Sequence, residues 1–277
     1  MWTIEQLLAE AIEGRVGRRF RGRDEVQEAD RADLTRAGER SIARPQEGFG
    51  PVGRRVLAAQ WALLLEAIDL PARPRVLELC AGGSDPVVVA LDAVFGASAE
   101  YVTMNLNRKL AAELTERTEH LELEVQIVED DAQNLRRHYA EDTFDCVCFH
   151  HAVNDILQTA IATARGMDTR EIDWWPTERT MIEWMAEQYR EDQMTSVGRP
   201  ELRRILGAAV EVVKPGGFLC FDHWTAVSSL EQDWFPGDLF NDMVVIAREE
   251  ALLLSAPLEE VTPAGLDRRW WMVLKRV

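Results

Sequence analysis

The sequence predicts an α/β protein whose mostly parallel sheet is covered by helices on both faces. From Arg75 onward, short apolar segments typical of strands alternate with longer segments of helical spacing. Parallel strands need crossover connections, and helices that alternate with strands supply them on both faces of the sheet. At 277 residues, of which 47% are hydrophobic, the chain is long enough to bury a large core.

Strands and helices are expected to alternate through most of the chain. The predicted strands are residues 75–80, 100–105, 124–128, 144–150, 217–223 and 270–276. The predicted helices are residues 3–13, 54–70, 85–95, 107–119, 131–140 and 200–213. We expect residues 1–55 to form an N-terminal helical or irregular extension and residues 56–277 to form the main domain.

A long insertion follows the fourth predicted strand. Residues 155–199 exceed the usual length of a connection in this architecture, and their tryptophans and methionines lie in segments of helical character. We therefore expect this insertion to form a helical cap over a site.

Composition argues against several classes of partner. The formal charge is −17, from 48 acidic and 31 basic residues, so we expect neither a nucleic-acid nor a membrane partner. The four cysteines, at positions 80, 146, 148 and 220, match no zinc pattern, and core packing is the interpretation favoured over metal binding. Because no signal peptide or membrane span is apparent, a cytoplasmic location is expected.

A tight turn follows the first predicted strand. Residues 75–80 run into Ala81, Gly82 and Gly83, and then into Asp85-Pro86, which is typical of a helix start. A strand, a glycine turn and a helix N-terminus together allow the backbone to approach a ligand closely. An ordinary strand-to-helix turn would have the same local pattern.

Five motifs in order resemble the class I S-adenosylmethionine-dependent methyltransferases. Residues 78–84 fall on the family's Asp/Glu-x-Gly-x-Gly-x-Gly turn, with Cys80 and Ser84 in place of the outer glycines. Asn105 stands where the family has an acid that binds the ribose. The remaining motifs are Val128-Glu129-Asp130-Asp131-Ala132, Phe144-Asp145-Cys146-Val147-Cys148-Phe149-His150-His151 and Val212-Val213-Lys214-Pro215-Gly216-Gly217-Phe218.

The resemblance covers about residues 55–277 and implies a Rossmann-like, seven-stranded sheet that binds S-adenosylmethionine. Its site residues, carried over position by position, all lie at predicted strand ends. The cofactor-binding residues that it implies are Glu78, Ala81, Gly82, Gly83, Asn105, Leu106, Asp131, Ala132 and His150. A parallel sheet binds ligands at this edge, outside the carboxyl ends of its strands.

Polar and aromatic residues near the fourth and fifth strands are candidates for catalysis and substrate binding. Histidine suits proton transfer near neutral pH. The catalytic candidates are His150, His151, Asn154 and His223, and the substrate candidates are Trp174, Trp175, Tyr189 and Asp222. Alternative interpretations are that a histidine packs against the cofactor, that Asn154 and Asp155 hold its methionine part, that Asp222 caps a helix, and that the aromatic residues are core.

The expected function is methyl transfer to a small molecule in a capped pocket, without a metal. One alternative keeps the cofactor but transfers or cyclises its aminocarboxypropyl group, forming azetidine-2-carboxylate and releasing methylthioadenosine. A second is a non-catalytic partner that keeps the fold. Residues 14–53 are compatible with closure over the cofactor or with a homodimer contact.

Overall fold

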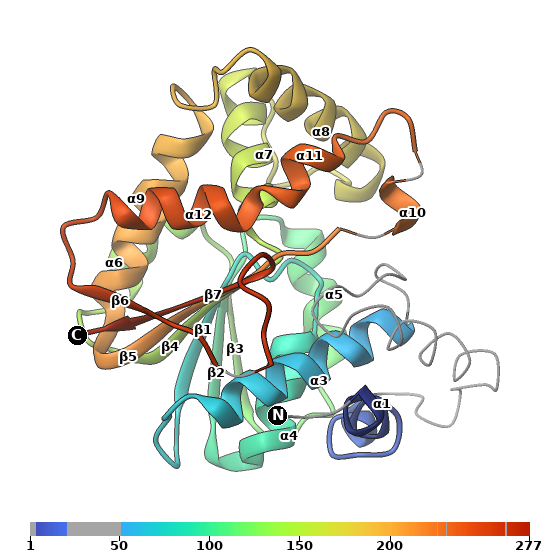
Figure 1. Ribbon diagram of the computed structural model, residues 1–277, viewed down its shortest axis with the longest axis vertical. Coiled ribbons are helices and arrows are strands. Elements are labelled where there is room, and N and C mark those ends of the chain that lie inside the picture. Colours follow the sequence, from blue (N-terminus) through green and yellow to red (C-terminus); the bar gives the residue numbers. More distant parts are fainter. Residues whose placement is uncertain (1–3, 21–50, 226, 231, 264) are drawn as a thin grey trace.

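A seven-stranded sheet forms the centre of the computed structural model, which describes residues 4–20, 51–225, 227–230, 232–263 and 265–277 (Figure 1). The strands are β1 (Arg75–Leu79), β2 (Glu100–Met104), β3 (Glu124–Val128), β4 (Phe144–His150), β5 (Val213–Asp222), β6 (Leu258–Val261) and β7 (Trp271–Arg276). The helices are α1 (Ile4–Ile12), α3 (Pro51–Ala67), α4 (Pro86–Phe95), α5 (Arg108–Thr118), α6 (Leu135–His138), α7 (Val153–Ala164), α8 (Trp174–Arg190), α9 (Gly198–Val212), α10 (Val227–Leu230), α11 (Gly237–Asn241) and α12 (Met243–Leu252).

The strand order is β3-β2-β1-β4-β5-β7-β6. The first five strands are parallel, and β7 runs antiparallel to both β5 and β6. Leu77 in β1 pairs with Val102 in β2 and with Val147 in β4, so the strand order reverses at β1. The mostly parallel α/β sheet with helices on both faces is confirmed, and its reversal point marks the edge at which such sheets bind ligands.

The predicted elements are mostly present, with differences near the C-terminus. β5 begins at Val213 rather than at residue 217, and the predicted helix 131–140 is reduced to a 3₁₀ turn (Ala132–Asn134) followed by α6. β6 and the helices α10 to α12 were not predicted. β6 is a four-residue edge strand with two glutamates, a composition that gives little strand signal. Most of the stretch 14–53 lies outside the described residues.

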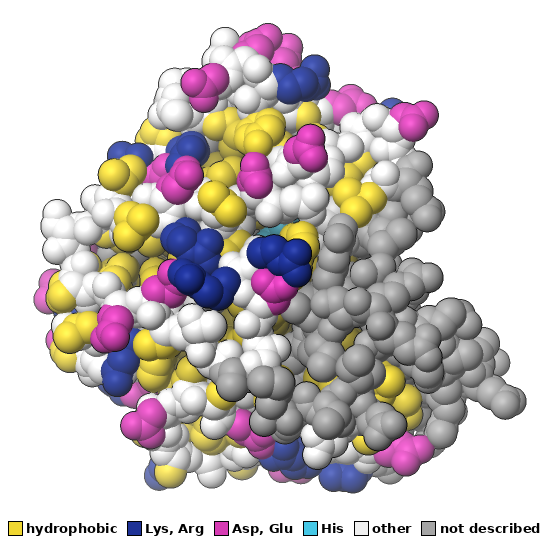
Figure 2. Space-filling view, viewed as in Figure 1, with side chains coloured by type: hydrophobic (Ala, Val, Ile, Leu, Met, Phe, Trp, Pro, Cys, Tyr) yellow, Lys and Arg dark blue, Asp and Glu magenta, His cyan; other side chains and the backbone are white. Residues whose placement is uncertain are grey.

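Ion pairs connect elements on the protein surface. The face shown in Figure 2 carries basic side chains interspersed with acidic ones. Glu260 in β6, for example, accepts hydrogen bonds from both Arg248 in α12 and Arg268. Among the described residues, no helix is long and apolar enough to cross a membrane.

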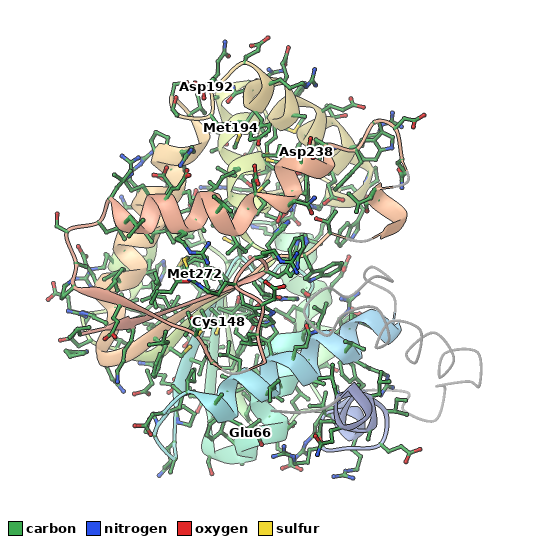
Figure 3. The ribbon with its side chains drawn as sticks, viewed as in Figure 1. Glu66, Cys148, Asp192, Met194, Asp238 and Met272 are labelled. Carbon is green, nitrogen blue, oxygen red and sulfur yellow. The ribbon has the colours of Figure 1, made fainter. Side chains whose placement is uncertain are left out.

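Each face of the sheet packs against its own set of helices. Leu77 and Leu79 lie in a core with residues of α7, α8, α9 and α12, whereas Val76 lies in a core with residues of α1, α3 and α4. In Figure 3, Met272 is on the α12 side and Cys148 on the α3 side. Burial on both faces agrees with β4, whose residues are all buried.

The insertion after β4 is helical, as expected. α7, α8 and the start of α9 lie at the top in Figure 1, beyond the carboxyl ends of the parallel strands. Trp174, Met181 and Met185 are buried, whereas Trp175 is 48% exposed. Most large apolar side chains of the insertion thus hold the cap on the domain.

Candidate functional site

A cavity of about 510 Å³ lies between the carboxyl ends of β1 to β3 and the helical cap. Its floor includes Cys80, Gly82, Asn105, Leu106, Asp131 and Ala132. Its walls include residues 155–164 on one face of α7, Trp174 of α8, and residues 196–205 around the start of α9. The volume is in the range of sites for small molecules, roughly 300–1,000 Å³.

The turn after β1 keeps a glycine-like backbone at two positions. Gly82 has a φ of 58°, and Cys80, which replaces the family's first glycine, has a φ of 61°. A left-handed conformation costs a non-glycine residue about 1–2 kcal/mol. The Cys80 amide donates to the Met104 carbonyl over 3.1 Å, and this hydrogen bond helps to hold the strained residue in place.

Asn105 holds the same turn from the end of β2. Its Oδ1 accepts from the Gly82 amide over 3.0 Å, and its Nδ2 donates to the Gly82 carbonyl over 3.1 Å. Because an amide side chain can make about four hydrogen bonds, Asn105 retains one acceptor and one donor position for a ligand. The contacts of Asn105 with Gly82 were not predicted from the sequence, and its ribose role stays a prediction.

The end of β3 adds a polar rim to the cavity. Asp131 Oδ1 accepts from the Gln133 amide over 2.9 Å and so caps the 3₁₀ turn that holds Ala132, which is 4% exposed. The preceding residue, Asp130, faces another way and contacts His138 Nε2 at 2.7 Å. Asp131 and Ala132 both line the cavity.

Asn107 connects the cavity floor to the cap. Its Oδ1 caps α5 by accepting from the Leu110 amide over 3.1 Å. Its Nδ2 donates to the carbonyl oxygens of Thr169 and Ile172, over 2.9 and 3.1 Å, in the loop between α7 and α8. One side chain therefore fixes the helix start beside the cavity and the loop of the cap.

The cavity is acidic. Three carboxylates line it, those of Asp131, Asp155 and Glu201, and Arg204 is the one cation among its described lining residues. The Cys80 thiol reports the local field, because burial and then the charges of Asp155, Asp131 and Glu78 raise its pKa. The acidic charges favour a cation at this point, whereas burial disfavours a charge of either sign.

A buried polar network lies behind the cavity floor, on the α3 side of the sheet. Glu78 Oε2 accepts from the Tyr101 hydroxyl over 2.5 Å, and burial raises the pKa of Glu78 to about 8 although His150 and Tyr101 lower it. His150 Nδ1 lies 2.8 Å from Asp222 Oδ1 and 3.1 Å from the Trp61 indole nitrogen. Burial lowers the pKa of His150, but the charge and hydrogen bond of Asp222 outweigh it, so the net shift is upward.

Two further histidines stack at the ends of β4 and β5. The rings of His151 and His223 are 4.0 Å apart and 25° from parallel. His151 has a φ of 51°, and its Nε2 lies 2.9 Å from the Trp224 carbonyl oxygen. Burial, followed by the charge of His150, lowers the pKa of His151 to about 4. Burial, followed by the charges of His151 and His150, also lowers the pKa of His223.

Comparisons with known proteins support the fold only. No protein-family model matches this sequence, and no curated protein matches it. A solved structure described as PH0851 aligns with 79% of this chain and 45% of its own at 13% identity, with a TM-score of 0.51. The protein PH0226 from Pyrococcus horikoshii OT3 gives 13% identity over 83% of this chain and 93% of its own, with a TM-score of 0.49. A SAM-dependent methyltransferase from Aquifex aeolicus is 12% identical over 77% of this chain and 86% of its own, with a TM-score of 0.44.

The strand order and the resemblance to PH0851 agree on one architecture, a Rossmann-like α/β fold with a mostly parallel seven-stranded sheet. Five of the residues that the sequence resemblance implies for the cofactor meet in the cavity: Gly82, Asn105, Leu106, Asp131 and Ala132. Ala81 and Gly83 flank Gly82 in the turn, but neither lines the cavity.

The predicted catalytic and substrate residues are spread more widely. None of the four catalytic candidates, His150, His151, Asn154 and His223, lines the cavity; all four belong to the packed ends of β4 and β5 or the start of α7. Trp174 lines it. Trp175 is 48% exposed and does not line the cavity, Tyr189 donates to Asp242 on the surface, and Asp222 pairs with His150.

Sequence reasoning missed several residues that line the cavity. Asn107 had a detectable signal, since an asparagine before a helical segment is typical of an N-cap. Glu201 and Arg204, on the first turns of α9, had none. Their place beside the floor depends on how the long cap returns to the sheet, which local patterns do not encode.

Proposed function

We propose that this protein is an S-adenosylmethionine-dependent methyltransferase that acts on a small-molecule acceptor. The observation that carries the proposal is the convergence of Gly82, Asn105, Leu106, Asp131 and Ala132 on one capped cavity. These residues come from three separate strand ends, and the sequence resemblance implies that all of them bind the same cofactor.

The cavity suits this cofactor chemically. S-adenosylmethionine carries a sulfonium and an ammonium, and three carboxylates face one guanidinium here. We propose that Leu106, Asp131 and Ala132 hold the adenine and that the unused positions of Asn105 bind the ribose. The amino-acid end would lie along the turn toward Glu78 and His150, since Glu78 Oε1 and His150 Nε2 are buried without a partner among the described residues.

The cofactor supplies an electrophilic methyl group. The chain's own part is to hold the acceptor in line with that methyl group and to exclude water, which the cap helices and Trp174 do by covering the strand ends. His151 and His223 do not line this cavity, so we propose that they position β4, β5 and the start of α7. Asp155, the first residue of α7 that lines the cavity, is nearer to the place of reaction.

A small-molecule acceptor fits the cavity and the charge better than a nucleic acid. The lining residues enclose the site on the floor, on α7 and on α9, which leaves room for a compact ligand. The formal charge of −17 repels phosphate backbones, and basic side chains of the surface pair with acids, as Arg248 and Arg268 do with Glu260.

Product analysis tests the proposal. The purified protein is incubated with S-adenosylmethionine, alone and with pooled small-molecule acceptors, and the nucleoside products are separated by chromatography. S-adenosylhomocysteine formed only with an acceptor supports the proposal. Methylthioadenosine released without an acceptor would instead establish aminocarboxypropyl chemistry, and absence of cofactor binding by calorimetry would leave the non-catalytic partner.

A further inference from the structure

Glu201 contributes to the cavity a carboxylate oxygen that no described side chain uses. Glu201 lies on the first turns of α9, lines the cavity and is only 8% exposed. Its Oε2 accepts from the Arg204 guanidinium, whereas its Oε1 is buried without a partner among the described residues. A buried acceptor that makes no hydrogen bond destabilises a protein, and a ligand that donates an N–H to it removes that penalty.

A chain of contacts connects Glu201 to the end of β3. The Arg204 guanidinium that contacts Glu201 also donates to Gln133 Oε1 over 3.2 Å. Gln133 in turn donates from its backbone amide to Asp131 Oδ1 over 2.9 Å. α9 also packs against the 3₁₀ turn that contains Ala132. Glu201 therefore lies at the same end of the cavity as Asp131 and Ala132, the residues proposed to hold the adenine.

The adenine base is a suitable donor for this oxygen. Its 6-amino group has two N–H donors, and a carboxylate accepts hydrogen bonds without donating any. If Asp131 accepts from one N–H, the other N–H still needs an acceptor. Burial raises the pKa of Glu201, and the charge of Arg204 opposes this shift, so the contact with Arg204 favours the ionised, accepting form.

We propose that Glu201 Oε1 accepts a hydrogen bond from the 6-amino group of the cofactor's adenine. The inference rests on the proposed function and adds a residue that determines specificity for the base. It makes one residue of the cap part of the cofactor site, so that the amino group is held between the end of β3 and the start of α9. Arg204 is a positioning residue in this arrangement, because it holds Glu201 Oε2 and leaves Oε1 for the base.

Calorimetry with two ligands tests the proposal: S-adenosylhomocysteine and its analogue with hydrogen in place of the 6-amino group. The protein is expected to bind S-adenosylhomocysteine at least about tenfold more tightly than the analogue, because the analogue leaves buried carboxylate oxygens without a donor. Glu201→Ala should reduce this ratio of affinities by about tenfold. Glu201→Gln keeps the length of the side chain and one acceptor oxygen, so its ratio should lie between those of the alanine variant and the unaltered protein.

Glu211→Ala is the matched control, because Glu211 also lies on α9 but accepts from Arg136 on the surface. It should keep the full ratio. If the protein binds S-adenosylhomocysteine but does not prefer it to the analogue, or if Glu201→Ala weakens both ligands equally, the proposed role of Glu201 is wrong while the proposed function stands. If S-adenosylhomocysteine does not bind at all, the proposed function fails, and the role of Glu201 fails with it.

Discussion

The floor and the cap of the cavity are built by different means. The floor consists of strand ends whose backbone is held by amide side chains, as Asn105 holds Gly82. The cap presents side chains on helices, with carboxylates from Asp155 and Glu201 and the ring of Trp174. Floor geometry follows from the fold and suits a ligand shared by many proteins, whereas cap residues can vary without disturbing the sheet. On this basis we propose that the floor binds the cofactor and that the cap, with Glu201 excepted, selects the acceptor.

The largest expected effect is on the floor. Gly82→Val places a β-branched side chain at a φ of 58° and displaces the backbone that Asn105 holds, so S-adenosylhomocysteine affinity should fall by about a hundredfold or more. Calorimetry measures this directly. Gly216→Val is the control, because Gly216 has a φ of 81° and open space around it but lies near the start of β5 and does not line the cavity. Equal affinity in the two variants would refute the role of the glycine turn.

The link between floor and cap is tested at Asn107. Asn107→Ser keeps a side chain that can cap α5 but removes the donor to Thr169 and Ile172. We expect a loss of about 1–2 kcal/mol in unfolding free energy and faster hydrogen exchange in residues 165–173. Asn134→Ser, which removes a hydrogen bond to Asp130 outside the cavity, is the comparison. Unchanged exchange in the loop would show that Asn107 does not hold the cap.

Glu78, which is buried behind the floor, predicts that the unfolding free energy depends on pH. The pKa of Glu78 is raised to about 8, so the folded state holds this proton up to higher pH than the unfolded state does. Its contribution to stability is complete below the ordinary pKa near 4.5 and is lost as pH rises through about 8. Between these two pH values the unfolding free energy of the unaltered protein should fall. In Glu78→Gln this fall should be smaller, by at most a few kcal/mol. Denaturant titrations at several pH values measure the unfolding free energy of the variant and of the unaltered protein. The prediction is contradicted if the unfolding free energy falls equally with pH in both.

The smallest expected effect is at Cys80. Glycine adopts a φ of 61° without strain, so Cys80→Gly should stabilise the fold by about 0.5–1 kcal/mol after the entropic cost of glycine is subtracted. Chemical denaturation measures the change. A loss of stability would mean that the packing of the thiol outweighs the backbone strain.

The sequence predicted the floor better than the cap, for a physical reason. The carboxyl ends of parallel strands meet at one edge, so locating β1, β2 and β3 was enough to bring Gly82, Asn105 and Asp131 together. The histidines were also located at strand ends, but the sequence could not show which face of the sheet each side chain takes. His150 points to the α3 side of the sheet, where it contacts Asp222. It does not line the cavity. The cap side of the cavity depends on how α7, α8 and α9 pack over the strand ends, which no local pattern specifies.

A crystal structure with S-adenosylhomocysteine bound tests the central claim most directly. The account predicts the adenosine on the floor, in contact with Asn105, Asp131 and Ala132, and the sulfur near Cys80 with its open side toward Asp155. A nucleoside bound outside this cavity, or a sulfur that faces away from the cap, would contradict the division of the site into a cofactor floor and an acceptor-selecting cap.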